Sequence, residues 1–103
     1  MLKAFLIQPM NGRKEREIIR ERELMKKVLL PYDFEVIDTY FIEKAPEGCN
    51  EGLFYLGKSI QAMGEADLII CLPHWRKNKG CRIEYKCAKA YKKNILRINL
   101  IKG

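Results

Sequence analysis

The sequence predicts a single α/β domain in which a mainly parallel sheet of four or five strands lies between helices, as in flavodoxin-like and Rossmann-like folds. Three observations predict it. Short apolar runs alternate along the chain with longer segments of helical composition. The apolar runs are nearly continuous, as in strands that are buried on both faces of a parallel sheet. The length of 103 residues, 48% of them hydrophobic, suits one core, so residues 1–103 are expected to form one domain.

The first two elements are a strand and a helix. Leu2 to Gln8 is a short apolar segment stopped by Pro9, which predicts a buried strand followed by a loop. Glu15 to Leu30 has acidic residues at its start, lysines near its end and apolar residues at helical spacing, and a proline follows it. These features predict an amphipathic helix over that range.

A second strand and a second helix follow, separated by an irregular connection. Phe34 to Ile37 has the composition of a short strand, and Phe41 to Asn50 contains a proline and a glycine that interrupt regular structure. Leu53 to Ala66 carries apolar residues three or four positions apart, which predicts the second helix. The connection lies where it can cover a ligand.

The last three elements repeat the alternation. Leu68 to Leu72 predicts the third strand, a polar and basic loop follows it, and Gly80 to Lys93 has helical composition. Ile95 to Ile101 predicts the last strand. In open parallel sheets, ligands bind beyond the carboxyl ends of the strands. The segments expected at that edge are residues 8–13, 40–51 and 73–84.

Glu84 is the most informative candidate residue. A helix that begins near Gly80 places Glu84 at the head of an otherwise apolar face that includes Ala88. A carboxylate near a helix N-terminus at this edge can act as a nucleophile or accept a hydrogen bond from a ribose hydroxyl. The structural alternative is a glutamate at the margin of the core, paired with Arg82 or a lysine.

The loop before this helix predicts a phosphate site. Arg76 and Asn78 precede Gly80, so positive side chains and free backbone N–H groups are expected to meet there. Trp75 beside them could stack on a base or ribose, or could instead cover the end of the sheet. His74 has no partner visible in the sequence and is interpreted as a loop residue.

Charge is distributed unevenly along the chain. From His74 to the end, ten lysines and arginines face the single acid Glu84, a local balance of +9 in a chain whose net charge is +7. This asymmetry indicates an anionic partner, either a nucleotide phosphate or a nucleic-acid backbone. A solvated helix face is the structural alternative for many of these lysines.

Several classes of protein are disfavoured by composition. The four cysteines form no CxxC pair and have one histidine to assist them, so neither a metal site nor a cofactor is predicted. The longest apolar runs are far shorter than the roughly 18 residues of a membrane span. The start of the chain lacks the long apolar centre of a signal peptide, so we expect a cytoplasmic protein of a bacterial cell with no membrane partner.

Residues 52–59 match the P-loop pattern GxxxxGK[ST] letter for letter. A P-loop follows a buried strand and wraps phosphates with flexible backbone. Here four bulky apolar residues occupy the loop positions, and a connection with proline and glycine precedes them. We therefore interpret these residues as the start of the second helix.

Three segments resemble the nucleoside 2-deoxyribosyltransferase-like superfamily: Phe5 to Gly12, Ala66 to Ile69, and Gly80 to Glu84 with Ala88. The resemblance covers nearly the whole chain and is greatest to a small branch common in bacteriophages and prophages, which has a Pro-x-Trp after the third strand. The branch also carries the first loop found here, Gln8, Pro9, Met10, Asn11 and Gly12.

The resemblance implies roles for single residues. In active members the first loop holds the sugar and a glutamate at the position of Glu84 attacks the anomeric carbon. Those enzymes also use an aspartate in the second helix, and the matching residue here is Ser59. A hydroxyl cannot replace a carboxylate as acid or base at neutral pH, so half of the catalytic pair is missing.

Three functions follow. The first is binding of a nucleotide-like ligand, used by a phage to sequester a host immune signal such as an ADP-ribose derivative or a cyclic nucleotide. The second is a deoxyribosyltransferase or N-glycosidase with Glu84 as nucleophile, and the third is nucleic-acid binding by the basic C-terminal third. The resemblance also implies a homo-oligomer. The residues expected to bind the ligand are Gln8, Pro9, Met10, Asn11, Gly12, Ser59, Trp75, Arg76, Asn78, Gly80, Cys81, Arg82 and Glu84.

Overall fold

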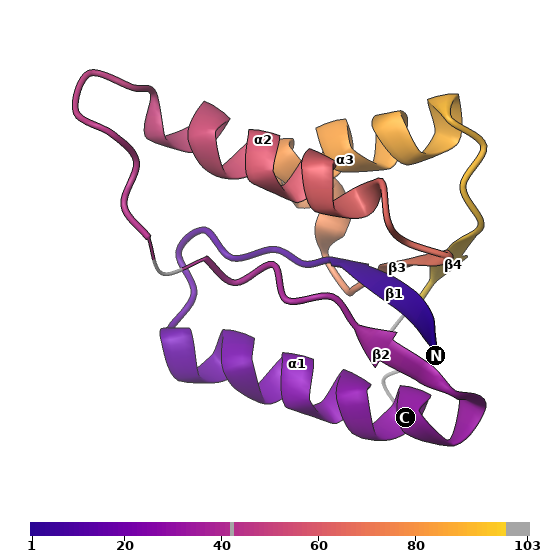
Figure 1. Cartoon of the computed structure of the whole chain (residues 1–103). Helices are drawn as coiled ribbons and strands as arrows, with labels where there is room; N and C mark the ends of the chain where they lie inside the picture. Colours follow the sequence, from indigo (N-terminus) through magenta and orange to yellow (C-terminus); the bar gives the residue numbers. More distant parts are fainter. Residues whose placement is uncertain (42, 99–103) are drawn as a thin grey trace.

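The strands of the computed structural model form one parallel sheet in the order β2-β1-β3-β4, which confirms the predicted fold class (Figure 1). The structure describes residues 1–41 and 43–98. The chain runs through β1 (Leu2–Ile7), α1 (Glu15–Leu29), η1 (Leu30–Tyr32), β2 (Phe34–Val36), α2 (Glu51–Met63), β3 (Leu68–Cys71), η2 (Trp75–Lys77), α3 (Lys79–Ala90) and β4 (Ile95–Arg97), where η marks a short 3-10 helix.

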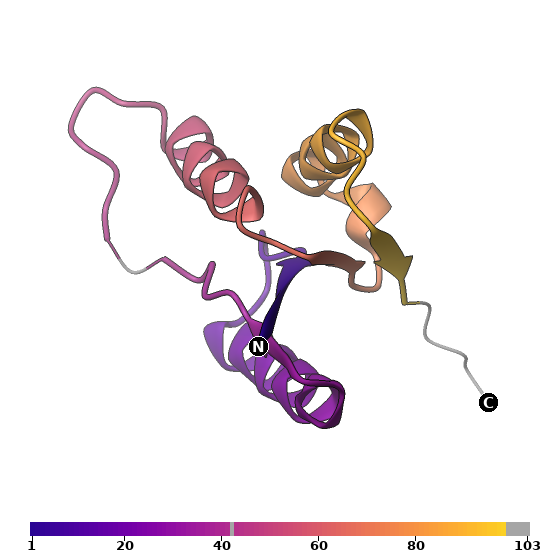
Figure 2. The ribbon, with the colours of Figure 1, turned by 45° about the vertical axis from the view of Figure 1, so that its right-hand side comes forward.

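Helices cover both faces of the sheet. α1 lies on one face, and α2 and α3 lie side by side on the other (Figures 1 and 2). Alternate residues of β1 serve the two faces, since Ala4 and Leu6 pack with α1 whereas Phe5 and Ile7 pack on the side of α2 and α3. The central strands are therefore almost continuously apolar, with Lys3 near the start of β1 as the exception, as the sequence indicated.

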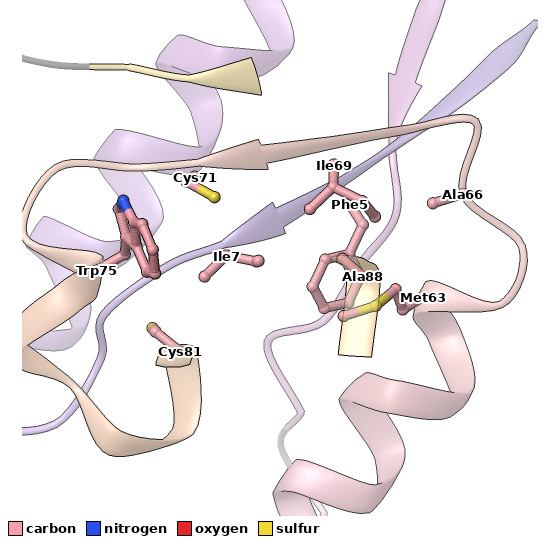
Figure 3. Close-up of a cluster of buried hydrophobic side chains, with 9 residues drawn as sticks. All are labelled: Phe5, Ile7, Met63, Ala66, Ile69, Cys71, Trp75, Cys81 and Ala88. Atoms are coloured by element: carbon pink, nitrogen blue, oxygen red, sulfur yellow. The ribbon is translucent and has the colours of Figure 1, made fainter. Parts of the chain in front are cut away.

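The core on the side of α2 and α3 is built around Phe5. Its ring is fully buried and lies beside Met63 and Ala88 in the close-up of this cluster (Figure 3). Ile69 and Cys71 of β3 extend the same cluster. This packing fixes how α2 and α3 sit on the sheet, and both helices contribute walls to the cavity described below.

Asparagine side chains begin both helices of this layer. The Oδ1 of Asn50 accepts a hydrogen bond from the N–H of Leu53 at 2.9 Å, and the Oδ1 of Asn78 accepts one from the N–H of Cys81 at 3.0 Å. At the other end of α2, the Nζ of Lys93 donates to the carbonyl of the C-cap residue Gly64 at 3.3 Å and to that of Ala66, just beyond it, at 2.9 Å. Free backbone groups at helix ends are thus satisfied by side chains.

We expect Asn50→Ala to lower the free energy of unfolding by about 1 kcal/mol, because α2 loses its side-chain cap. Urea unfolding monitored by circular dichroism measures the change. Asn50→Asp keeps an oxygen acceptor and serves as the matched control, with stability close to wild type. An alanine variant as stable as the aspartate variant would contradict the capping role of Asn50.

Element boundaries differ from the predictions by small amounts. α2 begins at Glu51, before the predicted Leu53, because Asn50 caps it, and it ends at Met63, ahead of Gly64. The loop after β3 contains the turn η2, which the sequence did not indicate. β4 ends at Arg97, and the part of the predicted last strand from residue 99 to 101 lies outside the described residues.

Membrane insertion through a helix can be judged for the described residues. Among them, no helix combines the length and the apolar character that a bilayer crossing requires.

Candidate functional site

A cavity of about 440 Å³ opens at the carboxyl end of β1, beside the segment that follows β2. Its walls come from the loop after β1, the segment after β2, one side of α2 and the first turns of α3, as expected for a parallel sheet. The volume falls within the range typical of sites for small ligands. Nine residues predicted from the sequence line it: Gln8, Met10, Asn11, Gly12, Ser59, Asn78, Gly80, Cys81 and Glu84.

Glu84 is the buried carboxyl group of this cavity. It lies on α3, and its side chain is hydrogen-bonded to Ser59 of α2. Only 8% of the residue is exposed. Burial raises the pKa of Glu84 to about 7, and the hydrogen bond from Ser59 offsets a part of that rise. Near neutral pH the group is therefore divided between its acid and its carboxylate form.

Such a carboxyl group can act in two ways on a sugar. As a carboxylate it accepts hydrogen bonds from ribose hydroxyl groups or attacks the anomeric carbon. As a neutral acid it donates a hydrogen bond to an oxygen of the ligand. A carboxyl group whose pKa is raised in a cavity is also a common mark of a functional site.

Cys81 lines the same cavity but is not a nucleophile. It is almost fully buried, and burial raises the pKa of its thiol to about 12. At neutral pH the thiol is therefore protonated, whereas the thiolate is the reactive form. Cys81 contributes an apolar wall beside Glu84.

A second cavity, of about 470 Å³, adjoins the first. Asn11 and Asn78 line both cavities and so form the boundary between them. Among the described residues, every charged side chain on the wall of the second cavity is basic. This wall contains Pro9, Arg13, His74, Lys77, Lys79 and Arg82, so it favours an anionic group such as a phosphate.

Gln8 lines the first cavity as a structural residue. Its Nε2 donates to the carbonyl of Ile18 at 3.0 Å and to Glu21 at 2.9 Å, and its Oε1 accepts from Arg22 at 2.8 Å. Both polar atoms of the side chain are engaged by α1. The sequence predicted a ligand contact for Gln8, whereas the structure uses its amide to hold the cavity wall.

Trp75 and Arg76 line neither cavity. Trp75 is 7% exposed, and its ring stacks on Tyr85 with ring centroids 4.3 Å apart. The guanidinium of Arg76 lies over the same indole at 4.9 Å from the ring centroid. The large apolar surface of the indole is buried in the core, so the structural alternative holds for Trp75 and base stacking does not (Figure 3).

The structure also places individual residues of the connection and of α2 on the cavity wall, most of them within the segment 40–51 that the sequence predicted at this edge. Thr39, Tyr40 and Phe41 line the first cavity on one side, and Tyr55 and Glu51 line it on another. Burial, and after it the Glu15 carboxylate that Tyr40 hydrogen-bonds, raises the pKa of the Tyr40 phenol. The adjacent aromatic residues Tyr40 and Phe41 were the sequence signal that could have predicted a ligand contact at the start of the connection.

The segment that resembled a P-loop is part of α2, as predicted. Lys58 forms an ion pair with Glu43 and lies 5.6 Å from the ring centroid of Phe41. The hydroxyl of Tyr55 donates to the carbonyl of Glu43 at 2.7 Å. Lys58 and Tyr55 thus attach the connection to α2 rather than surrounding a phosphate.

Metal binding was also considered for the described residues. Within residues 1–41 and 43–98, no group of three or more histidine, cysteine, aspartate or glutamate side chains lies close enough together to hold a metal ion.

The chain was compared with protein families, with curated sequences and with solved structures, and a solved structure shares its fold. Residues 4–97 match the family described as Domain of unknown function (DUF4406). No curated protein sequence matches the chain. Among solved structures, the chain is similar to the Clostridium botulinum CMP N-glycosidase BcmB, with a TM-score of 0.59 and 23% identity over 94% of this chain and 68% of that one. At this identity the likeness establishes a shared fold.

Proposed function

We propose, from the premise that the chain belongs to the DUF4406 family, that it binds a nucleoside phosphate with the ribose beside Glu84. One observation carries the proposal: a buried carboxyl group, bonded to Ser59, lines a cavity that adjoins a second, basic cavity. A sugar with hydroxyl groups suits the first cavity, and a phosphate suits the second. The fold shared with BcmB, a CMP N-glycosidase, supports a ligand of this class.

The arrangement of the two cavities is compatible with this placement. Asn11 and Asn78 line both cavities, and Lys79 of the basic cavity lies in the first turn of the helix that carries Glu84. A nucleotide with its ribose beside Glu84 would therefore direct its phosphate past Asn78 toward the basic cavity.

Hydrolysis of the N-glycosidic bond is the second candidate function. The carboxylate of Glu84 would form a bond to the anomeric carbon while the bond to the base breaks, and the base would leave with the electron pair and take a proton from water. The hydroxide that remains would attack the anomeric carbon and release Glu84. Ser59 stands where active relatives of the resembled superfamily have an aspartate, so the chain offers no acid there.

Mass spectrometry of purified protein separates the two candidates. Wild type and Glu84→Ala are incubated with nucleosides, nucleoside monophosphates, cyclic nucleotides and ADP-ribose, and the bound and free fractions are analysed. Intact ligand from heat-denatured wild type, with no free base, supports binding. Free base that disappears in Glu84→Ala supports the glycosidase, and the absence of both from the whole panel would contradict the proposed function.

The basic cavity gives a prediction of its own. We expect the double variant Lys77→Gln, Lys79→Gln to weaken binding of a nucleoside monophosphate by about tenfold or more, because charge-assisted hydrogen bonds to phosphate are lost. Binding of the matching nucleoside should change little. Calorimetry measures both affinities, and Lys86→Gln, on the exposed side of α3 outside both cavities, is the control. Equal weakening for nucleoside and nucleotide would contradict a phosphate in this cavity.

Three finer predictions from the resemblance belong to this proposal. Sequestration of a host immune signal by a phage-encoded protein would use the same pocket, and the ligand panel includes the signals concerned. A homo-oligomer is tested by sedimentation. Nucleic-acid binding by α3 ranks third, since Lys93 donates to the end of α2 and the ammonium of Lys89 lies over Tyr85. A steep loss of binding with added salt would favour nucleic acid.

A further inference from the structure

Arg22 is a charged residue inside the apolar stripe of α1. Ile18, Met25 and Leu29 form the stripe and pack toward the sheet, and Arg22 lies among them with 5% of its surface exposed. Burial of a guanidinium is costly unless its donors are satisfied. Neither cavity is lined by Arg22, so it meets no ligand there directly.

The donors of Arg22 join two segments that leave the sheet side by side. Nη1 donates to the Oε1 of Gln8 at 2.8 Å, directly beyond the end of β1. Nη2 donates to the carbonyl of Ile37 at 2.9 Å and to the Oγ1 of Thr39 at 3.0 Å, beyond the end of β2. One guanidinium thus connects the exits of two neighbouring parallel strands.

The acceptors of Arg22 belong to the walls of the ligand cavity. Gln8 and Thr39 both line the first cavity. Gln8 also donates to Glu21, which accepts from Arg13 at 3.0 Å. Because Arg13 lines the basic cavity, a continuous set of hydrogen bonds runs from the basic cavity through Arg22 to the far wall of the first.

From this network we infer that Arg22 is a positioning residue, which holds Gln8 and Thr39 in the places that shape the ligand cavity and the surroundings of Glu84 within it. The ligand in this inference is the one given by the proposed function. The positioning of Gln8 and Thr39 by Arg22 is argued from the hydrogen bonds alone. Arg22 acts through its acceptors and touches no reacting atom.

An arginine is required by the number and the direction of these bonds. Two nitrogens of the planar guanidinium donate to three acceptors on two segments. A lysine has one ammonium nitrogen at the end of a flexible side chain, so it cannot reach acceptors on both segments in the same way. Burial lowers the pKa of Arg22, and the carboxylates of Asp38 and Glu21 raise it in return. The guanidinium remains charged, so its hydrogen bonds do not titrate near neutral pH.

The experiment measures the pKa of Glu84 directly, by NMR titration of its side-chain carboxyl carbon, in full-length variants that fold. In Arg22→Lys and in Thr39→Val, the loosened wall should admit water, and the pKa of Glu84 should fall from about 7 toward its ordinary value of 4.5. Thr39→Ser keeps the hydroxyl and should restore the wild-type pKa. Lys26→Met, on the exposed surface of the same helix, is the control.

Affinity for cytidine 5′-monophosphate is measured on the same variants. We expect Arg22→Lys and Thr39→Val to bind this probe at least severalfold more weakly than wild type. If Arg22→Lys does not fold, the comparison of Thr39→Val with Thr39→Ser is sufficient to test the inference. Folded variants with the wild-type pKa of Glu84 would overturn the inference. If wild type bound neither this probe nor any other member of the ligand panel, the result would count against the proposed function, while the pKa of Glu84 would still test the role of Arg22.

Discussion

Glu84→Gln should make the protein more stable by roughly 3 kcal/mol at pH 8 and leave its stability unchanged at pH 4. Burial raises the pKa of Glu84 from 4.5 to about 7 in the folded chain. Each unit of difference between the folded and unfolded pKa corresponds to about 1.4 kcal/mol, so ionisation of the folded protein costs roughly 3 kcal/mol. Glutamine has nearly the same shape and carries no charge at any pH.

Proton linkage explains why Glu84→Gln gains stability relative to wild type as the pH rises. The folded state binds the proton of Glu84 more tightly than the unfolded state does, so folding is favoured while the group stays protonated. Below pH 4.5 both states are protonated and the variant gains nothing. Between pH 4.5 and 7 the unfolded state loses its proton first, and the wild type loses stability until the folded group has also ionised.

Urea unfolding of wild type and Glu84→Gln between pH 4 and 8 measures this effect as a difference, so other titrating groups cancel. Ser59→Ala provides an internal check. Loss of its hydrogen bond should raise the pKa of Glu84 further, so that stability continues to fall to a higher pH and the total loss is larger, but only where Glu84 is present. A constant difference between wild type and Glu84→Gln across this range would show that the carboxyl group is not desolvated.

Most of the fold could be predicted from the sequence because the strongest local patterns agree with the tertiary structure. The apolar run Leu68 to Leu72 and the capped helix that follows it carry their own signals. Helix boundaries depend on side-chain caps. The apolar pattern predicted that α2 begins at Leu53, two residues late, because the pattern does not include the cap Asn50. The turn η2 carries no periodic signal, since it is held by the burial of Trp75.

The site could be predicted in part, for a physical reason that differs from residue to residue. Glu84 and Ser59 were identified through helix position and resemblance, and the structure brings them into contact. Trp75 was ambiguous because an aromatic ring suits both a ligand and a core. Arg22 was missed, although a charge within an apolar helical stripe was visible, because its three acceptors come from two distant segments of the chain.

The two kinds of buried polar group in this molecule differ in their consequences. Arg22 is buried with its donors satisfied, so it strengthens the frame around the cavity. Glu84 is buried with the hydroxyl of Ser59 and an open cavity beside it, so at high pH its charge destabilises the fold. A group retained at such a cost is more readily explained by a ligand than by packing.

Phe5→Ala should lower the free energy of unfolding by roughly 3 to 5 kcal/mol, the usual cost of removing a buried aromatic ring. Phe5 belongs to the central strand β1 and is fully buried in the cluster that packs against α2 and α3. The free energy of unfolding of a small domain is only about 5 to 15 kcal/mol, so this loss is a large part of it. The urea midpoint should therefore fall steeply, with little change in the slope of the transition.

Leu53→Ala is the matched control, because Leu53 lies on α2 but is 67% exposed. Its stability should stay within about 0.5 kcal/mol of wild type. Phe5 does not line the ligand cavity, whereas its neighbour Leu6 does. Folded Phe5→Ala protein should therefore still bind a nucleotide that wild type binds, and a loss of binding without unfolding would mean that the cavity depends on how α2 and α3 pack.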